Sequence, residues 1–369
     1  MNSNRYVRQI TLPPIGEAGQ ARLNQGSVLF VGAGGLSSPA ALYLAAAGVG
    51  RLGLLDDDVV SLSNLHRQIL YATADEGSPK ARAALQRLSA LNPDIQIEAI
   101  SERFTPQNAE KMLLQYDLII DGSDNFPTKF LLNDAALKFG KPWIYGAVNG
   151  LEGQTALFLP DSGPCYRCLH PRVPTARIQN CAEAGVLGSV VGTIGTLQAT
   201  LALQYILAGS SPEHPLRPES GVLSILDFTG AWRFETFKIP PRADCVSCSI
   251  PHSEILLPTA THECAIPSRE ISAPELAQLQ QETGTTLCIL DVRESEEWES
   301  GHLEGALWWP LGRLEAGEFP TFPSNIQKLV VYCRSGMRSA KAAQLLQARA
   351  PLPPLNLSGG LGSWQGKLI

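Results

Sequence analysis

The sequence predicts an α/β protein in which a doubly wound, mostly parallel sheet is followed by a smaller α/β unit. Short apolar runs alternate with helical segments through the first third of the chain, and a second such alternation occupies the end. Between them lies a stretch rich in Pro, Ser and Thr without periodicity. A chain of 369 residues suits about two domains. We therefore expect a first domain over 1–250, a linker over 251–268 and a second domain over 269–369.

Composition narrows the class of protein. Apolar residues make up 44% of the chain and charged residues 17%, so large cores are expected and disorder is not. The net charge of −6 argues against a nucleic-acid surface. The first residues contain no apolar run of the secretory kind, so we expect a cytoplasmic protein. Eight cysteines in such a chain indicate metal ligation or thiol chemistry rather than disulfides.

Apolar periodicity predicts the elements of the first unit. Expected strands cover 28–31, 52–55, 95–100, 118–120, 143–147, 154–159, 222–226 and 232–238. Expected helices cover 39–47, 79–91, 106–114 and 128–139. Ser78-Pro79 and Thr105-Pro106 each place a capping residue before a proline at the first helical position. Sheets of this type bind ligands at the carboxyl ends of their strands.

The uncharged stretch 186–208 is long enough to require comparison with a membrane span. It carries six Ser, Thr or Gln side chains and three glycines. We therefore expect a helix buried in the protein or at a subunit contact, and no membrane span.

A glycine turn follows the first expected strand. Gly32-Ala33-Gly34-Gly35 joins that strand to a helix, so backbone N–H groups can approach a phosphate. Asp56 ends the next strand, where its carboxylate can accept ribose hydroxyls. Taken alone, the pattern fits a dehydrogenase that binds NAD almost as well as an enzyme that binds ATP. Ser37 at the third motif position weighs only mildly against the dinucleotide, and a tight turn that binds nothing is the remaining alternative.

Charged residues at later strand ends discriminate between these alternatives. Arg67, in Ser63-Asn64-Leu65-His66-Arg67-Gln68, and Lys80 offer cations to a triphosphate. Asp124, after the strand that ends near 120, can bind Mg²⁺. Each charge alone is typical of a solvated surface. Together, two cations and a metal-binding carboxylate favour an enzyme that binds ATP, because a site for hydride transfer needs no such combination of charges.

Two CxxC pairs, Cys165/Cys168 and Cys245/Cys248, match the ligand spacing of a closed Cys₄ zinc site. Closed sites are structural, and two unrelated redox pairs are the alternative. Cys181 lies outside both pairs between polar residues. It is either a small buried hydrophobe or, as we predict, a catalytic thiol.

Near the C-terminus the apolar run 329–332 leads into Cys333-Arg334-Ser335-Gly336-Met337-Arg338 and then a helical segment at 339–347. Backbone N–H groups, a helix N-terminus and two arginines there would stabilise a thiolate, so we predict a catalytic Cys333 assisted by Arg338. An ordinary turn cysteine is the alternative. Tyrosine phosphatases place five residues between Cys and Arg, and four lie here, which suits a persulfide better than a phosphoryl group.

Taken together, these residues resemble the MoeB/ThiF family of sulfur-carrier-activating enzymes, within the ubiquitin-activating superfamily, over roughly residues 5–248. That resemblance implies a Rossmann-like fold. The final segment resembles a rhodanese domain. The motifs that carry both resemblances are Arg5–Ile10, the Gly32 turn, Ser63–Gln68, Lys80, Asp124-Asn125, both CxxC pairs, Cys181–Gly185, Asp291–Arg293, Glu296, Gly301-His302 and Cys333–Arg338.

The resemblance implies a set of contacts and partners. Residues implied to contact ATP or its Mg²⁺ are Gly35, Asp56, Ser63, Asn64, Arg67, Lys80, Asp124 and Asn125. It further implies a homodimer in which Arg8 reaches the partner's nucleotide. The substrate would be a small ubiquitin-like sulfur carrier ending in Gly-Gly, similar to MoaD or ThiS. The sulfur donor would be thiosulfate or a persulfidated cysteine desulfurase.

The implied activity is adenylation of the carrier's terminal carboxylate followed by sulfur transfer from Cys333. Cys181 would either resolve an acyl disulfide or first form a thioester. Alternatives are activation of a ubiquitin-like protein for conjugation, a non-enzymatic nucleotide-binding scaffold, and a dehydrogenase fused to a phosphatase. Molybdopterin, thiamine, cysteine and tRNA-thiolation routes all use such carriers, and the sequence does not choose among them.

Overall fold

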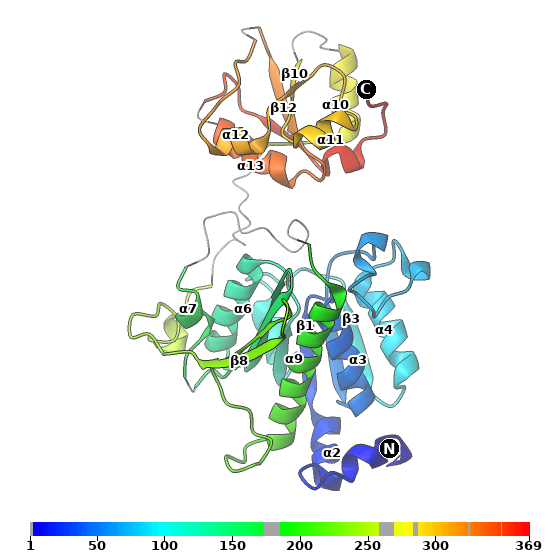
Figure 1. The fold of residues 1–369 in the computed structure, drawn as a ribbon, viewed down its shortest axis with the longest axis vertical. Helices are drawn as coiled ribbons and strands as arrows, with labels where there is room; N and C mark the ends of the chain where they lie inside the picture. Colours follow the sequence, from blue (N-terminus) through cyan, green and yellow to red (C-terminus); the bar gives the residue numbers. More distant parts are fainter. Residues whose placement is uncertain are drawn as a thin grey trace. The chain divides into compact units, whose positions relative to one another are not determined.

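The chain divides into two units, Met1–Thr261 and His262–Ile369, each of which is described by itself (Figure 1). The structure, a computed structural model, describes residues 3–161, 163–172, 185–257, 269–282, 287–323, 325–347 and 349–369. Most of the expected linker over 251–268 lies outside these ranges, so the expected domain bounds stay predictions.

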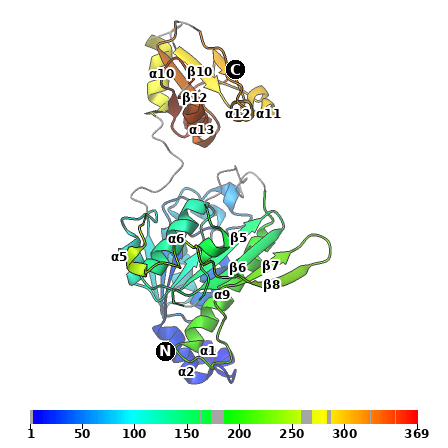
Figure 2. The ribbon, with the colours of Figure 1, turned by 90° about the vertical axis from the view of Figure 1, so that its left-hand side faces the viewer.

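An eight-stranded sheet forms the centre of the first unit, with the order β3-β2-β1-β4-β5-β6-β7-β8. The pairings from β3 to β5 are parallel, and those from β5 to β8 are antiparallel. Figure 2 shows the β7–β8 hairpin projecting at the end of this sheet. The strands are β1 (Ser27–Val31), β2 (Arg51–Leu55), β3 (Gln96–Ile100), β4 (Leu118–Asp121), β5 (Trp143–Asn149), β6 (Glu152–Phe158), β7 (Val222–Asp227) and β8 (Arg233–Lys238).

Helices cover both faces of this sheet. Val28 and Phe30 of β1 point into a core shared with α3 and α9, whereas Leu29 and Val31 point into a core shared with α5 and α6. Both faces of β1 are therefore buried, which confirms the predicted doubly wound sheet. The helices are α1 (Ser3–Ile10), α2 (Gly16–Gln25), α3 (Ser37–Ala47), η1 (Leu62–Asn64), η2 (Thr73–Asp75), α4 (Lys80–Leu91), α5 (Ala109–Leu114), α6 (Phe126–Lys138), α7 (Tyr166–Leu169), α9 (Gly188–Ala208) and η3 (His252–Glu254).

The helix starts predicted at Pro79 and Pro106 are wrong, and the helices predicted over 39–47 and 128–139 each begin two residues earlier, at Ser37 and Phe126. α4 begins at Lys80, and Pro79 is its N-cap in an extended conformation, because Pro79 pairs with Val59 in an isolated β-bridge. α5 begins at Ala109 with Asn108 as its N-cap. Asn108 Oδ1 accepts the Thr105 N–H at 2.8 Å, which closes a turn over 105–108 in place of a first helical turn.

The apolar helix α9 lies beside α3 and also packs on α2, β5 and β6 (Figure 1). By length and composition it could cross a membrane, the one such helix in the described ranges, and 44% of its most apolar window is buried inside the protein. The predicted helix is confirmed, and its buried residues include Val190, Ile194 and Ala202.

The second unit contains a five-stranded parallel sheet with the order β11-β10-β12-β13-β9. The apolar residues of β12 alternate between two cores, so this central strand is buried on both faces. Its strands are β9 (Arg269–Ile271), β10 (Leu287–Asp291), β11 (Ala306–Trp308), β12 (Lys328–Tyr332) and β13 (Leu355–Leu357). Its helices are α10 (Ala273–Glu282), α11 (Ser295–Glu299), α12 (Leu311–Glu315), α13 (Met337–Leu346) and η5 (Gly360–Ser363).

Candidate nucleotide, metal and sulfur sites

The glycine turn after β1 is held from two sides. Gly32 has a φ of +93°, and a side chain there would place its Cβ 2.8 Å from Gly122 O. The Ala33 N–H donates to Asp56 Oδ2 at 2.8 Å, and the Tyr71 hydroxyl donates to Ala33 O at 2.7 Å. The predicted turn and the predicted strand-end carboxylate are therefore brought together.

Arg67 lies against the same turn. A Cβ added at Gly35 would meet Arg67 Cγ at 3.4 Å. Arg67 Nη1 donates to Ser63 O at 3.1 Å and lies 2.8 Å from His66 Nε2. The segment that contains Ser63 and Asn64 thus folds back so that the aliphatic part of Arg67 lies beside Gly35 and its guanidinium contacts Ser63 and His66.

Lys80 is buried at the start of α4, and its ammonium donates to Asp58 Oδ2 at 2.6 Å. Burial alone would raise the pKa of Asp58, but the hydrogen bonds from Lys80 and from the Val59 N–H together hold that pKa below its ordinary value. Sequence reasoning missed Asp58 as a partner. The run of three aspartates after β2 indicated a carboxylate here but not which one faces the lysine.

Asp124 and Asn125 follow β4, which lies beside β1 with Asp121 opposite Val31. The two loops therefore leave the sheet at the same edge. Both residues are exposed, and Asn125 caps α6 by accepting the Thr128 N–H at 2.9 Å. Carboxylate and amide oxygens in this place fit the ligand preference of Mg²⁺.

A buried ion pair lies beneath the Asp124 loop. Lys129 Nζ donates to Asp121 Oδ2 at 2.6 Å, to Gly146 O at 2.7 Å and to Ser123 O at 2.9 Å. Asp121 is fully buried and Lys129 is 5% exposed. Sequence reasoning missed Lys129, because nothing in the spacing shows that it turns toward the sheet.

Arg8 lies away from these strand ends. Its neighbour on α1, Arg5, donates to Leu91 O at the end of α4, whereas Lys80 opens that helix. A helix of 12 residues spans about 18 Å. Arg8 therefore does not join the candidate nucleotide site of its own chain, and its predicted role toward a partner stays a prediction.

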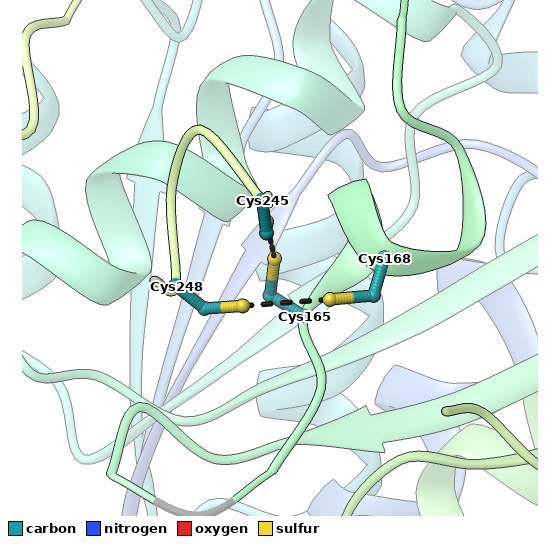
Figure 3. Close-up of side chains that lie close together, drawn as sticks. All are labelled: Cys165, Cys168, Cys245 and Cys248. Carbon is teal, nitrogen blue, oxygen red and sulfur yellow. Dashed lines mark hydrogen bonds between the residues drawn. The ribbon is translucent and has the colours of Figure 1, made fainter. Parts of the chain in front are cut away.

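The four paired cysteines form one cluster (Figure 3). Their sulfurs all lie within 4.8 Å of one another, with Cys165 and Cys245 at 3.6 Å and Cys168 and Cys248 at 3.4 Å. A tetrahedron with Zn–S bonds of 2.3 Å has edges of about 3.8 Å, so the donor set fits zinc. Burial raises the pKa of the Cys165 thiol to about 12, and a bound cation would reverse this preference. One cluster replaces the alternative of two separate redox pairs.

Cys333 occupies the predicted position between β12 and α13. Its Sγ accepts the Gly336 N–H at 3.1 Å and the Ser339 hydroxyl at 3.4 Å, and the residue is fully buried. Gly336 has a φ of +89°, which turns the loop around the sulfur. The donors converge as predicted, and thiolate character itself stays a prediction.

Arg338 is oriented by a residue from another element. Its two terminal nitrogens donate to the two oxygens of Glu297, both at 2.6 Å. These hydrogen bonds hold the pKa of Glu297 below its ordinary value. Glu297 lies on α11 and was not predicted as the partner of Arg338. The other arginine of the cysteine loop, Arg334, is exposed. The predicted Cys181 lies outside the described residues.

Comparison with known proteins agrees with both halves of this description. The ThiF family model matches residues 6–249, and the rhodanese-like domain model matches residues 272–367. A relative named probable adenylyltransferase/sulfurtransferase MoeZ, from Mycobacterium tuberculosis, is 34% identical over 98% of this chain and 92% of its own length. A relative named sulfur carrier protein adenylyltransferase, from Thermus thermophilus, is 49% identical over 57% of this chain and 79% of its own length.

The crystal structure of E. coli MccB with ATP shares the fold, with a TM-score of 0.57 and 20% identity, over 68% of this chain and 75% of that one. The family models span nearly the whole sequence in two consecutive blocks that correspond to the two units. The chain therefore belongs to the ThiF family and carries a C-terminal rhodanese-like domain.

Proposed function

We propose that this chain adenylates the C-terminal Gly-Gly carboxylate of a small ubiquitin-like sulfur carrier and then converts it to a thiocarboxylate. The first step joins a carboxylate oxygen of the carrier to the α-phosphorus of ATP and releases pyrophosphate. Adenylation is needed because a carboxylate alone would have to expel oxide. The family, and the names of relatives that act as adenylyltransferase and sulfurtransferase, support this proposal.

In the first step the glycine turn approaches the phosphates through its backbone, and Asp56 binds the ribose. Arg67 and Lys80 stabilise negative charge that develops as pyrophosphate departs. The residues that would hold Mg²⁺ are Asp124 and Asn125, and the ion would neutralise and orient the phosphates. The pairing of Lys80 with Asp58 supports the role of Lys80, because the hydrogen bond holds its ammonium at the start of α4 and compensates its charge.

In the second step Cys333 carries a sulfane sulfur as a persulfide, received from thiosulfate or a persulfidated protein. The outer sulfur attacks the acyl-adenylate carbon, the bond to AMP breaks, and an acyl disulfide forms on Cys333. A thiolate of Cys181 then attacks the Cys333 sulfur and releases the carrier thiocarboxylate, leaving a disulfide that a two-electron reductant reopens. In the other order, Cys181 first takes the acyl group from AMP as a thioester.

One observation carries the proposal. Cys333 is buried, yet its Sγ accepts two hydrogen bonds at the start of α13. This arrangement supports a sulfur anion whose reactive atom is the outer sulfur of a persulfide, one S–S bond farther out. A turn cysteine without chemistry needs neither donor.

The test incubates the full chain with Gly-Gly carriers, ATP and thiosulfate and reads each carrier by intact mass for replacement of one oxygen by sulfur. Cys333→Ala is expected to lose this product and keep ATP–pyrophosphate exchange. Asp124→Ala is expected to lose exchange as well. Product formed by Cys333→Ala at the wild-type rate, or undiminished exchange by Asp124→Ala, would refute the corresponding role.

We also infer a homodimer in which Arg8 completes the partner's nucleotide site, because Arg5 of the same short helix binds Leu91 O, at the end of α4 opposite Lys80. Mixing inactive Arg8→Ala and Asp124→Ala chains is expected to restore part of the exchange activity, since one site of each mixed dimer is then intact. Mixtures that stay as inactive as the separate variants would exclude this arrangement.

The cysteine cluster is proposed to bind one structural zinc ion through Cys165, Cys168, Cys245 and Cys248. The distances among the four sulfurs and the closed tetrahedral donor set support zinc rather than a catalytic metal. The expected content is one zinc per chain by elemental analysis, and the Cys248→Ala variant is expected to bind it far more weakly.

A further inference from the structure

The two cysteine turns are joined by a carboxylate as well as by their sulfurs. Asp134, on α6, is 4% exposed. It accepts two hydrogen bonds from Arg167, from Nε at 2.8 Å and from Nη2 at 2.6 Å. It also accepts one from the Ser247 hydroxyl at 2.8 Å. Arg167 lies between the cysteines of the first pair, and Ser247 lies between those of the second.

The neighbouring residue reinforces the same attachment. Asn133 Oδ1 accepts the backbone N–H of Tyr166, inside the first cysteine turn, at 2.9 Å. Its amide also donates to Asp134 Oδ1 at 3.1 Å. The Arg167 guanidinium further packs over the Phe130 ring of α6, 4.7 Å from its centre. Asn133, Asp134 and Phe130 of α6 therefore all contact the first cysteine turn. Of these three residues, Asp134 also contacts the second turn.

None of these contacts needs a metal. The Asp134 carboxylate is compensated by a guanidinium and a hydroxyl, so its burial is satisfied without a bound ion. Cys165 and Cys245 are 80 residues apart in sequence, and closing a loop of that length opposes the assembly of the site. A contact that holds the two turns together beforehand removes this cost from metal binding.

We propose that Asp134 is a positioning residue that latches the two cysteine turns together, so that the four sulfurs are gathered before zinc arrives. The inference rests on the proposed zinc site. It assigns the latch to a side chain that ligates nothing and that acts through Arg167 on one turn and Ser247 on the other. Groups that orient the ligands of a metal site commonly contribute 10–100-fold to its affinity, and we expect a loss in this range without Asp134.

The first test measures zinc affinity of the full-length chain by competition with a chromogenic chelator. Asp134→Asn keeps the side chain's shape but leaves a single acceptor oxygen, and it is expected to weaken zinc binding about 10–100-fold. The matched control is Glu98→Gln, which removes a carboxylate that is also paired with an arginine, Arg51, at 2.8 Å and that contacts neither cysteine turn. It is expected to leave zinc affinity unchanged. Equal affinity of Asp134→Asn and wild type would overturn the latch.

A double-mutant cycle separates a latch from a general loss of stability. Ser247→Ala removes the hydrogen bond between Asp134 and the second cysteine turn with a minimal change in the side chain. It remains informative if Asp134→Asn folds poorly. A latch needs its contacts with both turns. The variant that combines Ser247→Ala and Asp134→Asn is therefore expected to bind zinc no more weakly than Asp134→Asn alone. Additive losses would mean that Asp134 and Ser247 act independently, and would overturn the proposal.

The third measurement distinguishes failure of the latch from failure of the zinc site. Metal-free chain is treated with diamide, which oxidises two thiols to a disulfide, and the products are mapped by peptide mass. The wild type is expected to form links between turns, Cys165–Cys245 and Cys168–Cys248, as the short sulfur distances require. Asp134→Asn is expected to shift toward links within one CxxC turn. A wild type that binds no zinc but forms the links between turns would refute the metal and keep the latch, whereas links within turns in the wild type would overturn the latch.

Discussion

Each of the two units places a buried aspartate at the end of an inner strand of its sheet, and the two are stabilised in nearly the same way. Asp121 ends β4 and Asp291 ends β10, and both are fully buried. Each accepts the backbone N–H of the residue two positions later, at 3.0 Å from Ser123 and 2.9 Å from Arg293. Each is paired with a buried cation that lies over a tyrosine ring, 5.3 Å from its centre in the first unit and 5.7 Å in the second.

The cations differ in where they originate. Lys129 comes from α6, eight residues after Asp121, and its three protons reach three separate acceptors. Arg293 comes from the same turn as Asp291. Its guanidinium donates mainly to the Asp291 carboxylate and makes one further hydrogen bond, to Gly301 O at 2.7 Å. Lysine therefore ties a helix to a loop, whereas arginine stabilises its own turn and reaches one backbone oxygen after α11.

This difference matters for the chemistry that follows each aspartate. The Lys129–Asp121 ion pair holds α6 against the end of β4. It therefore also restrains Asp124 and Asn125, which lie between Asp121 and Lys129 in the sequence. The cysteine loop of the second unit gains no such direct anchor from Arg293, and its cation Arg338 is oriented separately by Glu297. In the first unit the buried ion pair therefore restrains the candidate Mg²⁺ residues directly, whereas in the second unit Arg338 is oriented by a separate ion pair.

The largest expected effect comes from Lys129→Met, which leaves Asp121 charged, buried and unpaired. Removing one partner of a buried ion pair costs about 3–5 kcal/mol. ATP–pyrophosphate exchange is expected to fall with it, because the Asp124 loop loses its anchor. Hydrogen exchange of peptides from 118–138 in the full chain measures the local stability. Lys129→Arg, which restores the charge but not the three-way geometry, is expected to recover stability more than exchange. A loss below about 1 kcal/mol would contradict the anchor role.

Arg293→Met is expected to cost somewhat less, about 3 kcal/mol, since fewer backbone acceptors lose their donor. Protection should fall in peptides from 287–323 and stay unchanged in the first unit. Exchange of ATP and pyrophosphate should also be unaffected. If that exchange falls as far as in Lys129→Met, the contrast between the two anchors is wrong.

Glu297→Gln tests the separate orientation of Arg338 and is expected to cost about 1–2 kcal/mol at neutral pH. The folded pKa of Glu297 is lowered, so its ion pair stabilises the fold above the ordinary glutamate pKa of about 4.3 and loses this contribution as pH falls through the lower folded pKa. Urea unfolding across this range should show the variant and wild type converging at low pH. A gap that stays constant with pH would count against the ion pair.

Asp58→Asn is expected to have the smallest effect, under about 1 kcal/mol. The Asp58 side chain is 63% exposed, so solvent screens its charge, and the asparagine oxygen can still accept the hydrogen bond of the buried Lys80 ammonium. The direction with pH is the same as for Glu297, since the pKa of Asp58 is also lowered in the fold. Unfolding of the first unit at neutral and acidic pH gives the comparison. A loss as large as that of Lys129→Met would show that exposure does not separate these pairs.

Much of the fold could be predicted, because long apolar runs have few alternatives. The short apolar run at β1, followed by glycines, is typical of a strand buried on both faces, and the long apolar stretch at α9 is typical of a buried helix. The three-residue strands β9, β11 and β13 could not be predicted, since such lengths show no periodicity. α1 was missed as well. Its packing depends on contacts with residues distant in the sequence: Asn92 donates to the Tyr6 hydroxyl at 2.8 Å, Arg5 donates to Leu91 O, and Gln9 donates to Ala47 O.

By itself the sequence determined the features that neighbouring residues define: the glycine turn, the two CxxC spacings and a cysteine between a strand and a helix. Short-range spacing sets backbone geometry at such places, so the residues carry their own local structure. Only the tertiary structure decided the partners, which are Asp58 for Lys80, Asp121 for Lys129, Glu297 for Arg338, and Asp134 for both cysteine turns. Which charges meet depends on how helices pack against the sheets, and many exposed carboxylates along the chain could have served equally well by spacing alone.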